Sequence, residues 1–497
     1  MTGCRRTSVL AAGATGLLVA AVLSAVAQQA VQKKPLVDSQ VPGISGKDLT
    51  VNQQGKPEQA APPQLTAFTT KEGKKGWKVV IPGNRPLATP AIADGKVLVG
   101  GGFGSHEFYA FDATTGKTSW VYQTGDDGPT AAVVADGYIA FNTESCELEI
   151  LTMEGKRVWK KWLGDPLMSM PAISKGRVYM AYPDSKGNRG HQLACFDIKT
   201  GQEFWKHPIA GDIITAPVIA DGKVYLATVE GTMYCFAESS GQLAWKEKKN
   251  ATSSPTVWNG KCLFSQREVV LVKDKNGKEI KQQTEQLTLR EPGQAGVYVP
   301  FSSTKTTADY LDYEKRKDHS SQEKSFKKAD GAVGFSLAPA AANLPQAQMN
   351  LGQGSVAGVW SYQGSRPFVY KNRLYSTMGD TVKCVDPAGN KVLWKKNLHE
   401  DKNKHLVDAA VTPPALVNGK IFVGTVQGEV ICLEADSGQE LWRATVGEPI
   451  VFQPAVAGGR VYVASSSGSL FCIETGDAND HGWLMWGGNA AHNGMVK

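Results

Sequence analysis

The sequence lacks the short motifs that identify several common classes of enzyme and metal site. It contains no Cys-x-x-Cys pair, no Gly-x-Ser-x-Gly and no His-Glu-x-x-His. A Cys-x-x-Cys zinc or redox site, the nucleophile elbow of an α/β-hydrolase and the zinc helix of a metalloprotease are therefore not predicted. We assign no catalytic residue and no metal ligand from the sequence.

A strong charge of one sign is also missing. The formal net charge is +7 over 497 residues, which is too small and too widely spread for a nucleic-acid-binding face. Beyond the first 27 residues there is no second long apolar run. We therefore expect no nucleic-acid partner and no transmembrane segment in the mature chain.

The first 27 residues have the layout of a secretory signal peptide. Arg5 and Arg6 precede an apolar run, and residues 25–27 read Ala-Val-Ala, a typical cleavage site. Cys4 lies before the run, so lipid attachment there is not expected. We predict an exported, soluble, periplasmic or extracellular protein, with the general secretory and twin-arginine routes both open. Residues 28–75, rich in Gln, Lys, Pro, Gly and Ala, are predicted to be a flexible leader.

Residues 76–497 contain a pattern that repeats about every 40 residues. Each copy has a proline, a glycine or asparagine five residues later, two alternating apolar segments, and then a glycine followed by a tryptophan. The eight copies begin at Pro90, Ala132, Pro171, Pro217, Pro255, Pro367, Pro414 and Pro454. In the copy from Pro255, Lys281 takes the place of the tryptophan. The interval from Pro255 to Pro367 is too long, which predicts one insertion at about 285–364.

Each copy fits about four short antiparallel strands with tight turns. A single sheet of this kind cannot bury both of its faces, whereas sheets arranged radially can. The pattern predicts an all-β protein, an eight-bladed β-propeller of four-stranded antiparallel blades. The Trp-Asp dipeptide of WD40 repeats is absent.

Two tryptophans compete for the strand that closes the ring. Trp77 lies in a segment that reads as the last strand of a copy without its earlier strands, and Trp483 is also near the right phase. We favour Trp77, beside the strand that contains Cys472, because a closed ring leaves no open edge at the join. Residues 486–494 are then expected to form a capping tail.

Eleven-residue stretches of these copies resemble the pyrroloquinoline quinone (PQQ) type repeat. They are AFDATTGKTSW, CFDIKTGQEFW, CFAESSGQLAW, CVDPAGNKVLW and CLEADSGQELW. The resemblance covers about residues 77–487 apart from the insertion. It implies that the tryptophans dock between blades, near the small first residue of a stretch and a glycine peptide. The belt implied in this way is Trp120, Trp159, Trp205, Trp245, Trp394 and Trp442.

The cysteines follow the phase of the repeat. Five of the seven in the mature chain occupy the first position of a stretch or its counterpart: Cys195, Cys235, Cys384, Cys432 and Cys472. Equivalent positions in neighbouring blades are expected about 10 Å apart, which is beyond disulfide reach. We interpret these cysteines as packing residues beside an indole ring.

The resemblance leaves two functional classes open. Quinoprotein dehydrogenases bind PQQ and Ca²⁺ at the ring axis and oxidise alcohols or sugars, whereas BamB-like relatives are non-catalytic scaffolds. The adjacent cysteine pair common in such enzymes is absent here. The best acidic loop for calcium contains Asp126 and Asp127. His399 and His405 lie in a polar connection and are interpreted as surface residues.

Three loops between blades are apolar enough for a protein-contact rim, namely residues 164–171, 211–217 and 447–454. In the alternative, Met168, Ile213 and Phe452 fill the ring axis. The insertion ends with Trp360 and Tyr362, and it is read as a lid, a partner-binding arm or a surface excursion.

We therefore expect an exported monomer that binds an envelope protein as a non-catalytic scaffold, with no cofactor. A PQQ- and calcium-dependent dehydrogenase and a carbohydrate-binding propeller are the alternatives.

Overall fold

The computed structural model describes residues 61–164, 169–183, 190–273, 276–290, 297–306, 367–378, 381–386, 391–398 and 411–494. The chain separates into two units, residues 1–60 and 61–497, and all described residues belong to the second. Much of the predicted leader, the middle of the predicted insertion, and Met168, Trp360, Tyr362, His399 and His405 lie outside the described residues.

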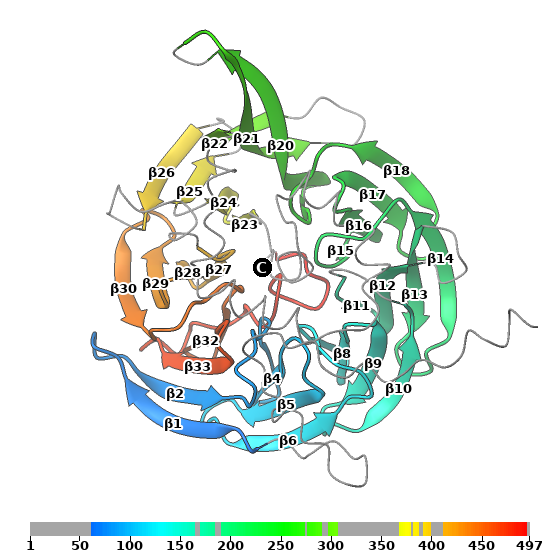
Figure 1. The fold of residues 1–497 in the computed structure, drawn as a ribbon, viewed down its shortest axis with the longest axis vertical. Coiled ribbons are helices and arrows are strands. Elements are labelled where there is room, and N and C mark those ends of the chain that lie inside the picture. Colours follow the sequence, from blue (N-terminus) through cyan, green and yellow to red (C-terminus); the bar gives the residue numbers. More distant parts are fainter. Residues whose placement is uncertain are drawn as a thin grey trace, which may run out of the picture. The chain divides into compact units, whose positions relative to one another are not determined.

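The described strands form antiparallel sheets of consecutive strands, arranged around a central axis (Figure 1). The first sheet contains β3 (Ala91–Ala93), β4 (Lys96–Gly100), β5 (Glu107–Asp112) and β6 (Thr118–Gln123). The second contains β7 (Val133–Ala135), β8 (Tyr138–Asn142), β9 (Glu147–Thr152) and β10 (Arg157–Trp162). The third contains β11 (Ala172–Ser174), β12 (Arg177–Pro183), β13 (His191–Asp197) and β14 (Glu203–Ile209). The fourth contains β15 (Val218–Ala220), β16 (Lys223–Ala227), β17 (Thr232–Ala237) and β18 (Leu243–Lys248).

The fifth sheet contains β19 (Thr256–Trp258), β20 (Lys261–Lys273), β21 (Glu279–Arg290) and β22 (Val297–Thr306). The sixth contains β23 (Phe368–Tyr370), β24 (Arg373–Met378), β25 (Thr381–Asp386) and β26 (Lys391–Asn397). The seventh contains β27 (Ala415–Val417), β28 (Lys420–Gly424), β29 (Glu429–Glu434) and β30 (Glu440–Thr445). The closing sheet contains β31 (Ala455–Ala457), β32 (Arg460–Ala464), β33 (Ser469–Glu474), β2 (Lys75–Val80) and β1 (Gln64–Thr69).

The predicted all-β propeller of antiparallel blades is confirmed, but its strand count needs a correction. Within the described ranges, seven sheets rather than eight are four-stranded, and the closing sheet has five strands. The extra strand is β1, which pairs with β2 in a segment that we expected to be leader. The leader therefore ends before Gln64 instead of at residue 75.

The ring is closed by pairing strands from near the two ends of the chain. In the closing sheet β2 pairs with β33, and Trp77 lies opposite Cys472, so the preference for Trp77 as the closing tryptophan is confirmed. Trp483 lies elsewhere, in an isolated bridge with Val456 of the inner strand β31. The hairpin that joins β1 to β2 also reaches the seventh sheet, where the Glu72 carboxylate accepts hydrogen bonds from Thr445.

The fifth sheet departs from the prediction. Strands β20 and β21 pair from Cys262 opposite Arg290 to Lys273 opposite Glu279, and they form a long hairpin, here called the arm, that projects from the ring (Figure 1). Lys281 therefore lies in the third strand, not in a fourth strand that lacks its tryptophan. The fourth strand is β22. The insertion cannot begin at residue 285, because β21 and β22 extend the sheet to Thr306.

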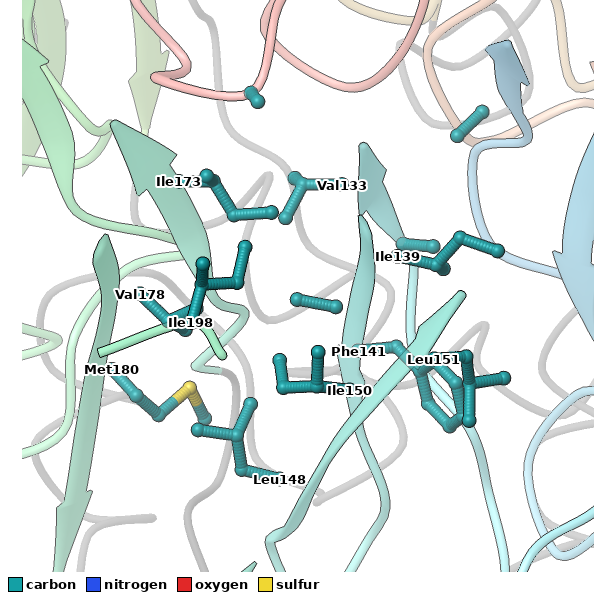
Figure 2. Packing of buried hydrophobic residues seen from close by; sticks show 14 of the residues in the cluster. Val133, Ile139, Phe141, Leu148, Ile150, Leu151, Ile173, Val178, Met180 and Ile198 are labelled. Atoms are coloured by element: carbon teal, nitrogen blue, oxygen red, sulfur yellow. The ribbon is translucent and has the colours of Figure 1, made fainter. Parts of the chain in front are cut away.

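The middle strands of most blades are buried on both faces, because each sheet packs between two neighbours. In β4, β8 and β16 four consecutive residues are buried, whereas the outer strands β6, β10 and β18 alternate between exposed and half-buried positions. Figure 2 shows this packing, where Phe141, Ile150 and Leu151 of the second sheet lie near Val178 and Met180 of the third. Apolar burial between such sheets drives the folding of the ring.

Each tryptophan of the repeat contacts a cysteine or its counterpart within its own sheet. Trp205 lies opposite Cys195, which in turn lies opposite Tyr179. The rings of Tyr179 and Trp205 are 5.9 Å apart and inclined at 52°. The same arrangement recurs at Cys235, Cys384, Cys432 and Cys472.

Most of these tryptophans also reach the next sheet along the chain. The indole N–H of Trp120 donates to the Met153 carbonyl at 3.2 Å, and a side chain on Gly155 would begin 2.7 Å from the same indole. Gly155 also has a φ of 76°, so both its space and its backbone favour glycine. The same indole-to-carbonyl bond joins Trp159 to Ile198, Trp205 to Glu238 and Trp394 to Ala435.

The five cysteines at this position are buried free thiols. Burial raises the pKa of the Cys195, Cys235 and Cys384 thiols to about 11, and that of Cys432 and Cys472 to about 12. These thiols stay protonated at neutral pH and are poor nucleophiles. The interpretation of these cysteines as packing residues agrees with this environment.

The tryptophans should therefore carry much more stability than the cysteines beside them. We expect Trp205→Ala, which removes a side chain that is 8% exposed, to lower the free energy of unfolding by about 3–5 kcal/mol. Cys235→Ala should cost about 1 kcal/mol, roughly the value for one buried methylene. Trp245 is only half-buried, so Trp245→Ala should cost less than Trp205→Ala. Denaturant unfolding measures all three, and equal costs for Cys235→Ala and Trp205→Ala would contradict the packing role.

Candidate functional site

The ring axis is the first candidate site, because the innermost strands of the sheets surround it. A C-terminal segment, residues 480–494, runs across these strands and is here called the strap. Its carbonyl groups accept hydrogen bonds from successive inner strands: Ile92 donates to Leu484, Ile173 to Ala490, Ile219 to Ala491 and Val456 to Trp483, at 2.6–2.9 Å. Val257 of β19 donates to the Asn493 side chain at 2.8 Å. The strap therefore satisfies donors that the inner strand edges would otherwise leave open.

Two tryptophans of the strap fill the axis with apolar surface. Trp486 is 1% exposed and packs among Ala88, Ala131, Met170 and Ala216, which come from four connections before inner strands. Trp483 is fully buried, and its ring meets Phe368 edge to face at 4.7 Å. The expected capping tail is thus found, with its side chains inserted at the axis.

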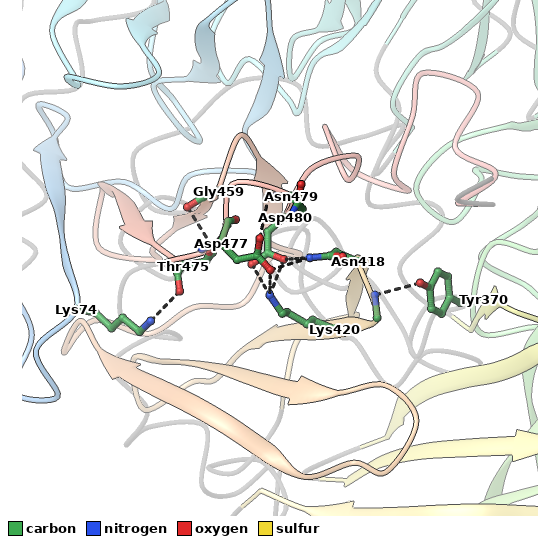
Figure 3. Close-up of polar contacts among 10 residues, drawn as sticks. Lys74, Tyr370, Asn418, Lys420, Gly459, Thr475, Asp477, Asn479 and Asp480 are labelled. Atoms are coloured by element: carbon green, nitrogen blue, oxygen red, sulfur yellow. Dashed lines mark hydrogen bonds and ion pairs between the residues drawn. The ribbon is translucent and has the colours of Figure 1, made fainter.

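An ion-pair cluster fixes the beginning of the strap to the seventh sheet (Figure 3). The Lys420 ammonium lies 2.7 Å from Asp477 and 2.8 Å from Asp480, and the Asn418 amide donates to both carboxylates at 2.9 Å. Asp480 is fully buried and Lys420 is 20% exposed. Burial favours the neutral amine, yet the hydrogen bonds to the two carboxylates raise the pKa of Lys420.

The second candidate site is the acidic loop predicted around Asp126 and Asp127. The structure brings a third carboxylate, Glu144 of the β8–β9 turn, to this loop. Glu144 accepts a hydrogen bond from the Gly104 amide at 2.6 Å, and its own amide donates to the Asp127 carbonyl at 2.9 Å. Asp126 accepts hydrogen bonds from Thr143 and from the Ser145 amide.

The carboxylates in this cluster repel one another. Burial raises the pKa of Glu144 to about 8, and the charges of Asp127 and Asp126 raise it further than the Gly104 bond and Arg85 lower it. Burial and then Asp126 also raise the pKa of Asp127. Glu144 therefore keeps its proton near neutral pH, so the cluster carries less negative charge than its composition indicates.

These residues do not fit a calcium site. Within the described ranges, no group of three or more His, Cys, Asp or Glu side chains has an arrangement that could hold a metal ion. The Asp126 and Glu144 oxygens already accept protein hydrogen bonds, and a protonated Glu144 is a poor ligand for a hard cation.

The apolar loops between blades turn inward. Ile213 is fully buried and Phe452 is 3% exposed, which contradicts the exposed-rim interpretation for these two side chains and agrees with the alternative. The reason is that the loops continue the blade pairing, since Ile213 bridges Thr228 and Ile450 bridges Ser465.

Sequence reasoning missed Glu144 and the cluster of Lys420 with Asp477 and Asp480. Glu144 belongs to no motif, and only folding brings it beside Asp127. For Asp477 and Asp480 a signal existed. The last copy reads ETGDAND and continues without the usual strand because β2 takes that place, so these residues had to make contacts outside their own blade.

Comparisons with known proteins agree with this fold. A family model described as "Outer membrane protein assembly factor BamB" matches residues 24–153, 147–290 and 360–483. The chain therefore belongs to this family of PQQ-like propellers. No protein with a curated description matches the sequence.

Similar solved structures include the computationally designed Ika8 protein, with 13% identity and a TM-score of 0.53 over 79% of this chain and 96% of that one. BamB from Moraxella catarrhalis has 15% identity and a TM-score of 0.49, over 83% and 98% of the two chains. A quinohemoprotein alcohol dehydrogenase from Comamonas testosteroni has 13% identity and a TM-score of 0.49, over 83% and 76%. At these identities the likeness concerns the fold alone. The described part of this chain contains no apolar helix of membrane-spanning length.

The ion-pair cluster should contribute strongly to stability. We expect Lys420→Met to lower the free energy of unfolding by about 3 kcal/mol, because it leaves the buried Asp480 without its cation. Lys223 has the same position in the fourth sheet but is exposed, so Lys223→Met should change stability by less than about 0.5 kcal/mol. Denaturant unfolding measures both, and similar effects of the two variants would contradict the role of the cluster.

Glu144 should make stability depend on pH. Its pKa in the folded protein is about 8, above the usual 4.5, so its contribution is complete below about pH 4.5 and is lost as pH rises towards 8. Glu144→Gln keeps the acceptor for Gly104 without the charge, so this variant should melt at a higher temperature than the wild type at pH 8 and at nearly the same temperature at pH 4.5. Glu154→Gln, which removes an exposed carboxylate with a lowered pKa, should show no such gain. A gain for both variants would rule out this cause.

Proposed function

We propose that this chain is an exported, non-catalytic scaffold that binds a protein partner in the cell envelope. The observation that carries the proposal is the filled axis, where Trp483 and Trp486 are buried among side chains from several sheets. The description of its family as an outer-membrane assembly factor supports the same role. The predicted signal peptide supports export.

The alternative, a PQQ- and calcium-dependent dehydrogenase, has less support. In such enzymes the cofactor lies at the ring axis, and here the strap places two indole rings and a chain of backbone hydrogen bonds in that region. The oxygens of the acidic loop do not fit a calcium ion, as described above. We therefore derive no reaction step through a quinone. The carbohydrate-binding alternative stays a prediction.

The arm is the surface feature best placed to meet a partner. It projects from the ring (Figure 1), and the Leu271 side chain on it is 65% exposed. At the level of Lys273 and Glu279 the arm is only two strands wide, because β22 pairs with β21 only as far as Gln282. Free strand edges of this kind are used by other proteins to bind extended segments.

A cofactor assay and a crosslinking assay together test the proposal. The purified full-length protein, incubated with PQQ and Ca²⁺, should retain no quinone absorbance after gel filtration and should not reduce a dye with alcohols or sugars. A photo-crosslinking amino acid at Leu271 should capture a partner in the cell envelope. The same substitution at Leu243, which is 42% exposed on the outer strand of the fourth sheet, is the matched control.

The outcomes distinguish the two functions. Bound quinone together with dye reduction would overturn the scaffold proposal. A partner captured at Leu271 and not at Leu243 would support it and place the contact on the arm, whereas equal capture at both positions would support binding and reject the arm as the contact.

A further inference from the structure

The strap ends in a histidine whose two ring nitrogens both face carbonyl oxygens. His492 Nδ1 lies 2.7 Å from the Trp486 carbonyl within the strap, and Nε2 lies 2.9 Å from the Pro171 carbonyl of the β10–β11 connection. The side chain is 1% exposed, and its ring meets the Trp486 ring at 5.2 Å and 72°.

A carbonyl oxygen can only accept a hydrogen bond, so each of these contacts needs an N–H on the histidine. A neutral imidazole has one N–H and one lone pair, whereas the imidazolium ion has two N–H groups. Both contacts are hydrogen bonds only in the imidazolium form. In the neutral form one nitrogen lone pair points at a carbonyl oxygen less than 3 Å away, which is repulsive.

We infer that the strap is an acid-stabilised closure of the ring axis, and that His492 binds the proton responsible. The Nε2 bond is the one that joins the strap to another element, so loss of the proton weakens the attachment to Pro171. The residues on either side of His492 bind three inner strands, through Ala490 to Ile173, Ala491 to Ile219 and Asn493 to Val257. Detachment at Pro171 therefore loosens the strap over the third, fourth and fifth sheets.

The groups packed around His492 bear on the sign of the effect. On the strap these are Trp486, Gly487 and Asn489, and on the β10–β11 connection they are Met170 and Pro171, none of which titrates. The other titratable groups of the strap are Asp480 and His481, whose described bonds are to Lys420 and Asn418 and to the Gly458 amide. Burial opposes a charge on His492, and the two carbonyl oxygens favour it.

The sign of the dependence follows from linkage. A proton held more tightly in the folded protein than in the unfolded chain stabilises the folded state at low pH, and this stability is lost as pH rises through the folded-state titration. Above the point at which the unfolded histidine titrates, the equilibrium for strap opening should rise about tenfold per pH unit until the folded ring has released its proton.

Nuclear magnetic resonance of the full-length protein with ¹⁵N-labelled histidine tests the protonation directly. We expect the His492 ring to carry N–H groups on both nitrogens at pH 5.5 and on one nitrogen at high pH. The amides of Ile173 and Ile219 should lose hydrogen-exchange protection over the same range, relative to the Leu226 amide inside the β16–β17 ladder. A His492 ring with a single N–H at every pH from 5 to 9 would overturn the inference, whether or not any variant folds.

Two variants separate His492 from the rest of the strap. His492→Gln should make strap opening independent of pH over this range, because the titrating group is gone. His481→Gln is the matched control, since His481 is an exposed strap residue whose Nδ1 accepts from the Gly458 amide, and it should behave as the wild type. An unchanged pH dependence in His492→Gln would refute the assignment.

Discussion

The fold depends on an indole ring that each of several sheets inserts into the next. In the first, second, third and sixth sheets this ring donates its N–H to a carbonyl of the following sheet, and at four junctions with described contacts a glycine without space for a side chain lies beneath it. A sheet in such a ring is stable only with neighbours on both sides. The spacing of the repeat, the buried cysteines and the turn glycines all follow from that requirement.

At the axis, the strap plays the part that the tryptophans play between sheets. It contacts inner strands with its backbone and fills the space between them with Trp483 and Trp486. An axis filled by the chain itself has little room for a cofactor, which is why a binding function is the stronger proposal. The acidic loop points the same way, because its oxygens are occupied by hydrogen bonds and one of its carboxyls keeps a proton near neutral pH.

The parts of the fold that repeat could be predicted from the sequence, and the parts that occur once could not. The tryptophan and the first residue of each stretch recur at a fixed distance, so their contact and the closing role of Trp77 followed from counting. The arm was misread because KNGKEI, with its glycine before an apolar residue, resembles the turn before a last strand, although here it joins β20 to β21. Glu144, Lys420 and His492 have partners that no repeat specifies, and only the closed ring brings those partners together.

The closing sheet has a consequence for the order of folding. Lys74 and Thr475, which are joined by a hydrogen bond there, are 401 residues apart in the chain, so this sheet cannot form before nearly the whole polypeptide is available. Closing so long a loop costs conformational entropy and makes the last step of folding slow. Until then β33 and the β1–β2 hairpin are open strand edges at the two ends of an incomplete ring. We therefore expect aggregation of the newly exported chain to depend on how fast its C-terminal part is delivered.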